Sequence, residues 1–564
     1  MNSTLPQTTG DVTMFRRSPD EVMTLTRMGA AHPMRLSFLR QLLRRVEAEG
    51  WRFDRSLWDV DARGVGRAVY RAIGPVRTYS LVAFAHDLPD EMRSDRVIAT
   101  AWDATFALFD GDPTFADIDR LAANVPLQEA GRISQRELSL SRANRSVRLF
   151  AHVIERLSQG LQPDPAEVAA VGYLMRTTAV YGAGKFGAAD RSLIANRAEL
   201  SAPFQAEMLS VWLIRQFTTD LVEHLAAAKG GDRAVRLEPA IRRSLGVGNS
   251  TGLGMAPFLV RHPMLMNNWM WAREEALARV RAQTSAETAS VQRLREALTD
   301  ARRNADLWHS DHPIQIAKLK DLRVDLDLIE TKLTTWPERT RHPWDELWQW
   351  GEASLTVEGQ EALLSLMLEP HGQLIDDLGA TMSAEESIAV RIDGSMTVDT
   401  LRRLIDDLFR WALDIDFTDP ANTARFWYVS EEKLEPRLGE RHCEEGAALE
   451  QPLCIARLVT ELNESLQVVD GSISLAAFLM QNPAQRYAVR RVQIAQDHPF
   501  AEVRDNLIGA GMLPIDLMRC KLAFFGASRF DPRSDKWVRI SLFQEMPYPD
   551  EMAGRIHGAD DRSS

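Results

Sequence analysis

The sequence predicts a mainly α protein with two small β elements, an α+β class with a helical core and a long antiparallel helical hairpin. Apolar residues recur at three- and four-residue intervals through most of 126–413. Extended runs beside turn residues are confined to 67–109 and 425–543. Neither a repeat of ~20–50 residues nor a regular βαβ alternation is found, which argues against solenoids and doubly wound folds.

Composition and charge indicate a soluble globular chain with an ample core. Of 564 residues, 45% are hydrophobic and 26% charged. The net charge of −12 argues against sequence-independent nucleic-acid binding, which needs clustered positive charge. Cys443, Cys454 and Cys520 lack paired metal spacing, which fits a reducing cytoplasm. No signal-peptide or bilayer-length apolar run occurs, so we expect a cytoplasmic protein without a membrane partner.

Stretches rich in polar residues, proline and glycine divide the chain into seven predicted parts. They are 1–18, a flexible tail; 19–125, a small α+β unit with a β-hairpin; 126–285, a helical core with two glycine-rich loops; 286–335, a helical hairpin; 336–420, helical; 421–550, a C-terminal α+β unit; and 551–564, a flexible tail.

The first α+β unit is predicted from a change of period. Leucines at helical spacing predict a helix over Met34–Trp51. The runs Arg67–Ile73 and Val76–Phe84 flank Gly74-Pro75 and predict a β-hairpin. Val97–Phe109 is a candidate third strand, although its alanines leave a helix open.

From about Pro126 to Trp350 the signals in the sequence are nearly all helical. Apolar spacing predicts helices over Leu138–Leu157, Ala166–Val180 and Phe204–Ala228. In Val291–Ala305 and Leu319–Leu333 the apolar steps are 3, 4, 3, 4, which predicts an antiparallel hairpin with a heptad-like seam. The hairpin would dock on the body of the protein or form a dimer contact.

The C-terminal part mixes helices and strands. Its predicted helices are Ala353–Leu378, Thr400–Leu413 and Leu453–Leu466, and its predicted strands are Arg425–Val429 and the pair Lys521–Phe525 and Lys536–Phe543.

The glycine-rich stretch Gly246–Pro257 is the first candidate site. It contains four glycines and Asn249-Ser250-Thr251, and apolar helical sequence follows it. Backbone N–H groups in a glycine turn can form a nest for an anion, and a following helix N-terminus favours negative charge. The glycine spacing matches no named phosphate motif. A tight interhelical turn with close packing explains the pattern equally well.

A second glycine-rich loop, Tyr181–Gly187, carries Gly184 and Lys185. A lysine held there could reach a phosphate or carboxylate, or act as an acid or base. The alternative is a helix C-cap with an exposed lysine. Arg142, Arg145 and Arg148 are three residues apart on a predicted helix and suit an anionic group, unless they form a solvated face.

The third candidate is Phe426–Arg437, where an aromatic strand runs into charged residues. Tyr428 and Glu432 are candidate proton-transfer groups, and Arg437 a candidate substrate ligand. A solvated loop is the alternative. The clusters His309–His312 and His442–Glu445 have neither a helical histidine pair nor paired cysteines, so we expect no metal site, and no cofactor or nucleotide motif is recognised.

These observations predict an enzyme that acts on a small anionic metabolite, a carboxylate or phosphate, by acid–base chemistry, with a cofactor-independent lyase as one candidate class. Loops 182–187 and 246–254 would hold the anion. Its predicted catalytic residues are Lys185, Tyr428 and Glu432, and its predicted substrate-binding residues are Gly184, Asn249, Ser250, Thr251, Arg145 and Arg437. The alternative is a non-catalytic interaction or scaffold protein that uses the helical hairpin and the Trp336–Trp350 segment, with homo-oligomerisation through the hairpin. An enzyme with a flavin or another unrecognised cofactor is a third reading.

Overall fold

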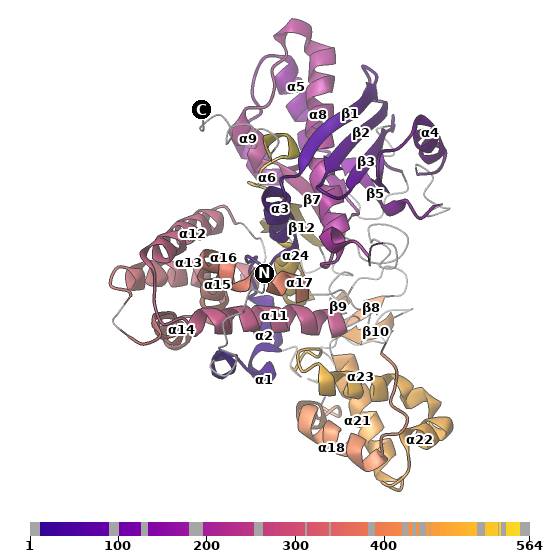
Figure 1. Ribbon diagram of the computed structural model, residues 1–564, viewed down its shortest axis with the longest axis vertical. Helices are drawn as coiled ribbons and strands as arrows, with labels where there is room; N and C mark the ends of the chain where they lie inside the picture. The colour runs from indigo at the N-terminus through magenta and orange to yellow at the C-terminus, as the bar shows by residue number, and fades with distance from the viewer. Residues whose placement is uncertain are drawn as a thin grey trace. The chain divides into compact units, whose positions relative to one another are not determined.

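The computed structural model (Figure 1) divides the chain into two compact units, which are described separately. Unit 1 comprises residues 1–36, 252–524 and 532–538, and unit 2 comprises 37–251, 525–531 and 539–564. The structure describes residues 12–89, 101–125, 134–179, 194, 196–252, 263–308, 310, 313–337, 340–381, 390–419, 427–430, 436–438, 447–451, 453–504, 514–527, 529–531 and 537–552.

A nine-stranded mixed sheet contradicts the predicted mainly α fold class. Its strand order is β1-β2-β3-β4-β5-β6-β7-β12-β11. The pair β6–β7 is parallel, whereas the pairs from β1 to β6 and β11–β12 are antiparallel. The strands are β1 Arg52–Val60, β2 Gly66–Ile73, β3 Thr78–Ala85, β4 Ala104–Asp110, β5 Glu137–Arg145, β6 Tyr173–Thr177, β7 Gly246–Gly252, β11 Arg529–Asp531 and β12 Trp537–Leu542.

The long helix α8 (Gln205–Gly230) packs on the sheet within unit 2, at the position predicted from its apolar spacing. Phe217 of α8 meets Phe106 of β4 edge to face, with ring centroids 5.4 Å apart. Helix α4 (Phe115–Asn124) belongs to a separate apolar cluster with Val69 and other residues of β2 to β5. Successive strand residues point to opposite faces, so each strand contributes to both layers. The other helices of unit 2 are α3 Phe38–Ala48, α5 Leu149–Ser158, α6 Pro165–Val171 and α9 Pro239–Ser244, with short 3-10 helices at Ala198–Leu200 and Gly231–Arg233.

The predicted β-hairpin is confirmed, since β2 and β3 pair antiparallel from Ile73↔Thr78 to Gly66↔Ala85. The predicted helix over 138–157 is wrong in its first half, which is strand β5. The alternation Leu138-Ser139-Leu140-Ser141 has the two-residue period of a strand.

The helix predicted over Ala166–Val180 is also too long. Gly172 has a left-handed φ of 76° and ends α6, so Tyr173–Thr177 is free to form β6. Because β5 and β6 were predicted as helices, the middle of the sheet was absent from the predicted fold.

The stretch that begins at Gly246 is a strand rather than an interhelical loop, because Gly246–Gly252 forms β7. Two of its glycines are explained by packing. A Cβ on Gly248 would lie 2.5 Å from Cγ of Tyr173, and a Cβ on Gly246 would lie 2.5 Å from the carbonyl oxygen of Leu542. Glycine permits this close approach of β7 to its neighbours, although in a strand and not in the interhelical turn that the packing alternative predicted.

Gly248→Ala is therefore expected to destabilise unit 2 by about 1–3 kcal/mol, since the new methyl group must displace the Tyr173 ring. The measurement is urea unfolding beside the exposed control Val147→Ala, which should change stability by less than about 0.5 kcal/mol. Equal stability of the two variants would mean that the ring moves freely.

Unit 1 is mostly helical. The predicted hairpin is formed by α12 (Thr288–Asp306) and α13 (Pro313–Leu333), which run antiparallel: Arg295 Nη2 donates to the Leu333 carbonyl, and Arg323 Nη2 to that of Ala305. The other helices are α1 Pro19–Val22, α2 Leu25–Gly29, α11 Pro263–Arg281, α14 Pro343–Ser354, α15 Val357–Leu368, α16 Gly372–Ile375, α17 Leu378–Thr381, α18 Val398–Leu408, α19 Arg410–Leu413, α21 Leu453–Gln467, α22 Leu475–Gln481, α23 Arg486–Asp497 and α24 Pro514–Phe525, with 3-10 helices at Thr13–Phe15, Glu369–His371 and Pro483–Gln485.

A three-stranded sheet of order β10-β8-β9 also belongs to unit 1, with β8 Trp427–Ser430, β9 Pro436–Leu438 and β10 Ala447–Gln451. Strand β8 overlaps the predicted strand at 425–429. The predicted strand Lys521–Phe525 is wrong, because these residues end α24. The second predicted strand corresponds to β12, which pairs with β11 instead.

Buried charges join the N-terminal residues of unit 1 to its helices. The guanidinium of Arg17 donates to both Glu274 oxygens at 2.7 and 2.8 Å and to Glu361 at 2.9 Å. Arg27 and Arg273 lie 3.1 and 3.0 Å from Glu361. We call Arg17, Arg27, Arg273, Glu274 and Glu361 the buried ion cluster. It fixes the start of the described chain against α11 and α15.

Candidate functional site

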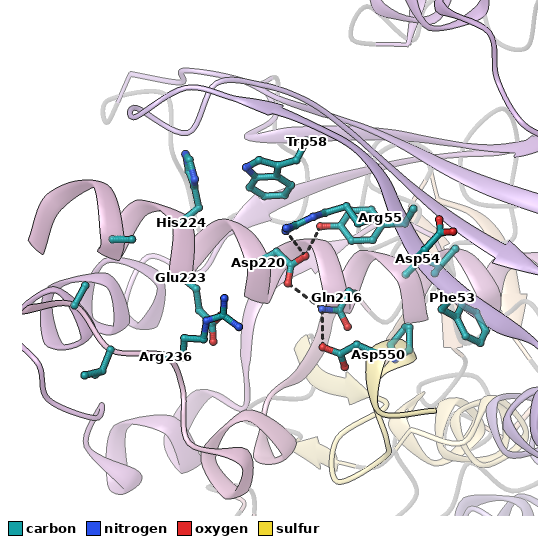
Figure 2. A pocket seen from close by; sticks show the side chains of 16 residues that line it. Phe53, Asp54, Arg55, Trp58, Gln216, Asp220, Glu223, His224, Arg236 and Asp550 are labelled. Carbon is teal, nitrogen blue, oxygen red and sulfur yellow. Dashed lines mark hydrogen bonds and ion pairs between the residues drawn. The ribbon is translucent and has the colours of Figure 1, made fainter. Parts of the chain in front are cut away.

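Unit 2 contains a cavity of about 620 Å³ between β1 and α8 (Figure 2). Residues 234–236 and the C-terminal residues Pro549 and Asp550 complete its wall. The lining residues are Phe53, Asp54, Arg55, Trp58, Tyr70, Leu213, Gln216, Asp220, Glu223, His224, Ala227, Ala234, Val235, Arg236, Pro549 and Asp550. Charged and polar side chains make up half of this lining, and Phe53, Trp58 and Tyr70 are its aromatic members. Polar groups that converge beside aromatic rings can orient a small molecule.

One face of α8 supplies part of the polar lining. Leu213, Gln216, Asp220, Glu223 and Ala227 follow one another in steps of 3, 4, 3 and 4. That spacing places them on a single stripe of the helix. Gln216, Asp220 and Glu223 therefore line up along one side of α8, toward the cavity.

A β-bulge in β1 arranges the opposite wall. Arg55 pairs with Tyr70 and Leu57 with Val69, so Ser56 is an extra residue with no partner of its own. In a regular strand, residues three apart point to opposite faces. The bulge brings Arg55 and Trp58 to the same face, and bulges commonly re-aim side chains in this way. The Arg55 guanidinium carbon lies 4.7 Å from the Trp58 ring centroid.

Asp220 is the centre of the hydrogen-bond network in the cavity. Its Oδ2 accepts from the Tyr70 hydroxyl at 2.7 Å and from Arg55 Nη1 at 2.9 Å. Its Oδ1 accepts from Gln216 Nε2 at 2.9 Å, and the same amide reaches Asp550 at 3.3 Å. Burial is the largest cause that raises the pKa of Tyr70 well above its ordinary value, and Asp220 adds to it, so the phenol keeps its proton.

Glu223 is less completely held. Its Oε1 accepts from the Leu237 N–H at 3.1 Å, whereas Oε2 has a 3.9 Å contact with the exposed Arg236. Burial raises the pKa of the Glu223 carboxyl, and the charge of Asp220 acts in the same direction. Neighbouring His224 bonds through Nε2 to the Asp61 carbonyl and lies edge to face with Trp58. A carboxyl with a raised pKa in a cavity is a candidate acid–base group.

The raised pKa makes a prediction about stability. Because the folded state favours protonated Glu223, its contribution to stability is present below the ordinary pKa and is lost as pH rises through the raised one. Glu223→Gln should therefore gain stability relative to the natural protein between about pH 4 and about pH 8. Urea unfolding of both proteins at the two pH values measures this change. A difference in stability between variant and natural protein that is the same at both pH values would contradict the raised pKa of Glu223.

Most of the predicted site residues cannot be placed in this cavity. Gly184, Lys185 and Glu432 lie outside the described residues. Ser250 and Thr251 continue β7 as strand residues. None of the described candidates lines the cavity.

Arg145 and Asn249 occupy the sheet of unit 2. Arg145 is on β5, 3.6 Å from Asp103, with its guanidinium over Phe150. Because β5 is a strand, Arg142 and Arg145 lie three residues apart on opposite faces, which corrects their predicted shared helix face. Asn249 is 1% exposed, and its Oδ1 has no hydrogen-bond partner among the described residues.

Tyr428 and Arg437 are brought together in the backbone register. They are direct partners in the antiparallel pair β8–β9. This pairing is compatible with a joint role for the two residues, which stays a prediction.

The residues of the cavity were not predicted from the sequence. The available signal was the helical spacing of Gln216, Asp220 and Glu223 within Phe204–Ala228, although Glu207, Arg215 and other polar residues are spread around the same helix. A polar stripe in a helix that is otherwise buried marks either solvent or a site.

Comparisons with protein-family models, curated proteins and solved structures found no match to this chain. Within the described ranges, no three or more His, Cys, Asp or Glu side chains are grouped so as to hold a metal ion. The helices of the described part include none with the length and apolar character of a membrane span.

Proposed function

We propose that this protein is a cytoplasmic enzyme that acts on a small polar molecule by acid–base chemistry in the cavity between β1 and α8. The observation that carries the proposal is Glu223, a carboxyl with a raised pKa and one weakly engaged oxygen, in a cavity lined by polar and aromatic side chains. A general base needs a pKa near the working pH and an oxygen able to reach the substrate.

In this scheme Glu223 transfers the proton and Asp220 orients the substrate. Asp220 accepts from three groups, Tyr70, Arg55 and Gln216, so its charge is well compensated. The two carboxyls, three residues apart on one helix face, would thus take separate roles, Glu223 in proton transfer and Asp220 in substrate binding.

The test is consumption of metabolites from a cell extract, followed by mass spectrometry. The natural protein should deplete at least one compound, and Glu223→Gln should slow that depletion by about 10²–10⁴-fold, the usual contribution of a general acid or base. The matched control is Glu167→Gln on α6, an exposed carboxyl outside the cavity, which should retain full activity. Equal turnover by Glu223→Gln and Glu167→Gln would refute the role of Glu223.

The anion site predicted at loops 182–187 and 246–254 stays a separate proposal. Its structural support is limited to Asn249, whose buried Oδ1 has no partner among the described residues. Lys185→Ala and Asn249→Ala would each weaken binding of a carboxylate or phosphate metabolite while leaving the melting temperature nearly unchanged. Unfolding of both variants, without a separate ligand effect, would make these residues structural.

A scaffold role for the α12–α13 hairpin is the second candidate function. Ile316, Val324 and Leu328 of α13 are 48%, 53% and 41% exposed, more than a helix buried on both sides would allow. Such a surface suits a second copy of the chain. If two copies associate through the hairpin, Val324→Glu should lower the molecular mass measured by light scattering. A natural protein that is monomeric would rule out self-association through the hairpin.

A further inference from the structure

Arg55 occupies a position that resembles a bound ligand. Its guanidinium lies over the Trp58 ring, pairs with Asp220 at 2.9 Å, and comes from the edge strand β1. An aromatic face beside a carboxylate is a common binding arrangement for organic cations. The Arg55 side chain is 44% exposed, whereas that of Asp220 is 16% exposed. The head of the arginine can therefore leave toward solvent, while its acceptor stays in the wall.

The acceptor side of this arrangement is fixed without Arg55. The Tyr70 hydroxyl and the Gln216 amide hold Asp220 from β2 and α8, and both residues are buried. Trp58 is held by packing near Phe217 and His224. Removal of Arg55 would thus leave a preformed carboxylate and an open aromatic face, which are the parts of a cation subsite.

We propose that Trp58, Asp220 and Tyr70 form a subsite for a guanidinium or primary ammonium group of the substrate, and that Arg55 is an internal competitor that the substrate displaces. The subsite rests on the proposed function of the cavity and names its substrate class, an organic cation. Arg55 returns to Trp58 and Asp220 when the ligand leaves, so the carboxylate is never left without a counter-charge.

Butylguanidinium and butylurea make a matched pair of probes, because they share shape and differ in charge. By titration calorimetry the natural protein should bind butylguanidinium at least about tenfold more tightly than butylurea, and Arg55→Ala should strengthen that binding about tenfold more. Asp220→Asn should weaken it about tenfold or more. Arg63→Ala, in the exposed β1–β2 turn, is the control and should change nothing.

Three results would overturn the proposal: no preference for the cation, binding to Arg55→Ala but not to the natural protein, or unchanged binding by Asp220→Asn. If Asp220→Asn fails to fold, Trp58→Leu replaces it, since it removes the aromatic face and leaves the carboxylate. The failure of the proposed enzyme function can be distinguished from the failure of the subsite. Glu223→Gln should slow turnover by about 10²–10⁴-fold but alter butylguanidinium binding by less than about threefold. Binding of the probe by a natural protein that turns over no metabolite would keep the subsite and reject the enzyme.

Discussion

Glu361→Gln is expected to destabilise unit 1 by about 3–5 kcal/mol, the largest effect among the charge substitutions considered. Glu361 accepts from Arg17 and Arg27 at 2.9 and 3.1 Å, and Arg273 lies 3.0 Å away. Burial alone would raise the pKa of this carboxyl, but the charges of Arg17 and Arg273 lower it to about 2. Glutamine keeps the shape and removes the charge, which leaves Glu274 as the single carboxylate of the buried ion cluster against three guanidiniums.

Urea unfolding and limited proteolysis of residues 12–28 measure this effect. The stability contributed by Glu361 is present above its ordinary pKa and is lost as pH falls through the folded pKa of about 2, so the natural protein should weaken across that interval and the variant much less. Glu21→Gln is the control, because the carboxylate of Glu21 is partly exposed and its contact with Arg27 is long, at 3.7 Å. A loss below about 1 kcal/mol would mean that solvent or a rearranged partner compensates the cluster.

Arg215→Lys is expected to destabilise unit 2 by about 2–4 kcal/mol and to lower the affinity of the cavity for any ligand that it binds. The buried guanidinium donates to the carbonyls of Leu245, Arg243 and Met546 at 2.7 to 3.0 Å and lies 3.8 Å from the Tyr548 ring centroid. A lysine cannot reproduce this planar fork. Released carbonyls near residues 545–548 would loosen the segment that carries Asp550 into the cavity.

Urea unfolding gives the stability change, and hydrogen exchange of residues 546–552 gives the local effect. Arg236→Lys is the matched control, since Arg236 lines the same cavity but is 89% exposed. It should leave both measurements within about 0.5 kcal/mol of the natural protein. If Arg215→Lys behaves like Arg236→Lys, the segment is held by other contacts.

The sequence predicts elements whose pattern is local and misses those that depend on distant pairing. Helix α8 and the β2–β3 hairpin were found because their apolar spacing and Gly74-Pro75 turn are contained in short windows. Strand β1 was missed because it is an edge strand with charged residues on both faces and therefore no clean alternation. Strand β7 was predicted as a loop because glycines such as Gly246 and Gly248 are typical of loops. Only the structure shows that Tyr173 and Leu542 pack against them and leave no room for a side chain.

The cavity could not be predicted for the same reason. Its polar groups come from β1, α8 and Asp550, nearly five hundred residues apart in the sequence at the extremes. The bulge at Ser56 decides which β1 side chains face the cavity. No short motif encodes that geometry. The anion site predicted from glycine loops relied on local sequence alone, and its lysine lies outside the described residues.

The central claim is that the cavity between β1 and α8 is where a small molecule binds and reacts. Hydrogen exchange of the whole protein, with and without a metabolite that it consumes, tests this most directly. We predict slower exchange in residues 53–58, 216–224 and 234–236. Slower exchange confined to residues 182–187 and 246–254, with the cavity segments unchanged, would contradict the claim and move the site to the glycine-rich segments.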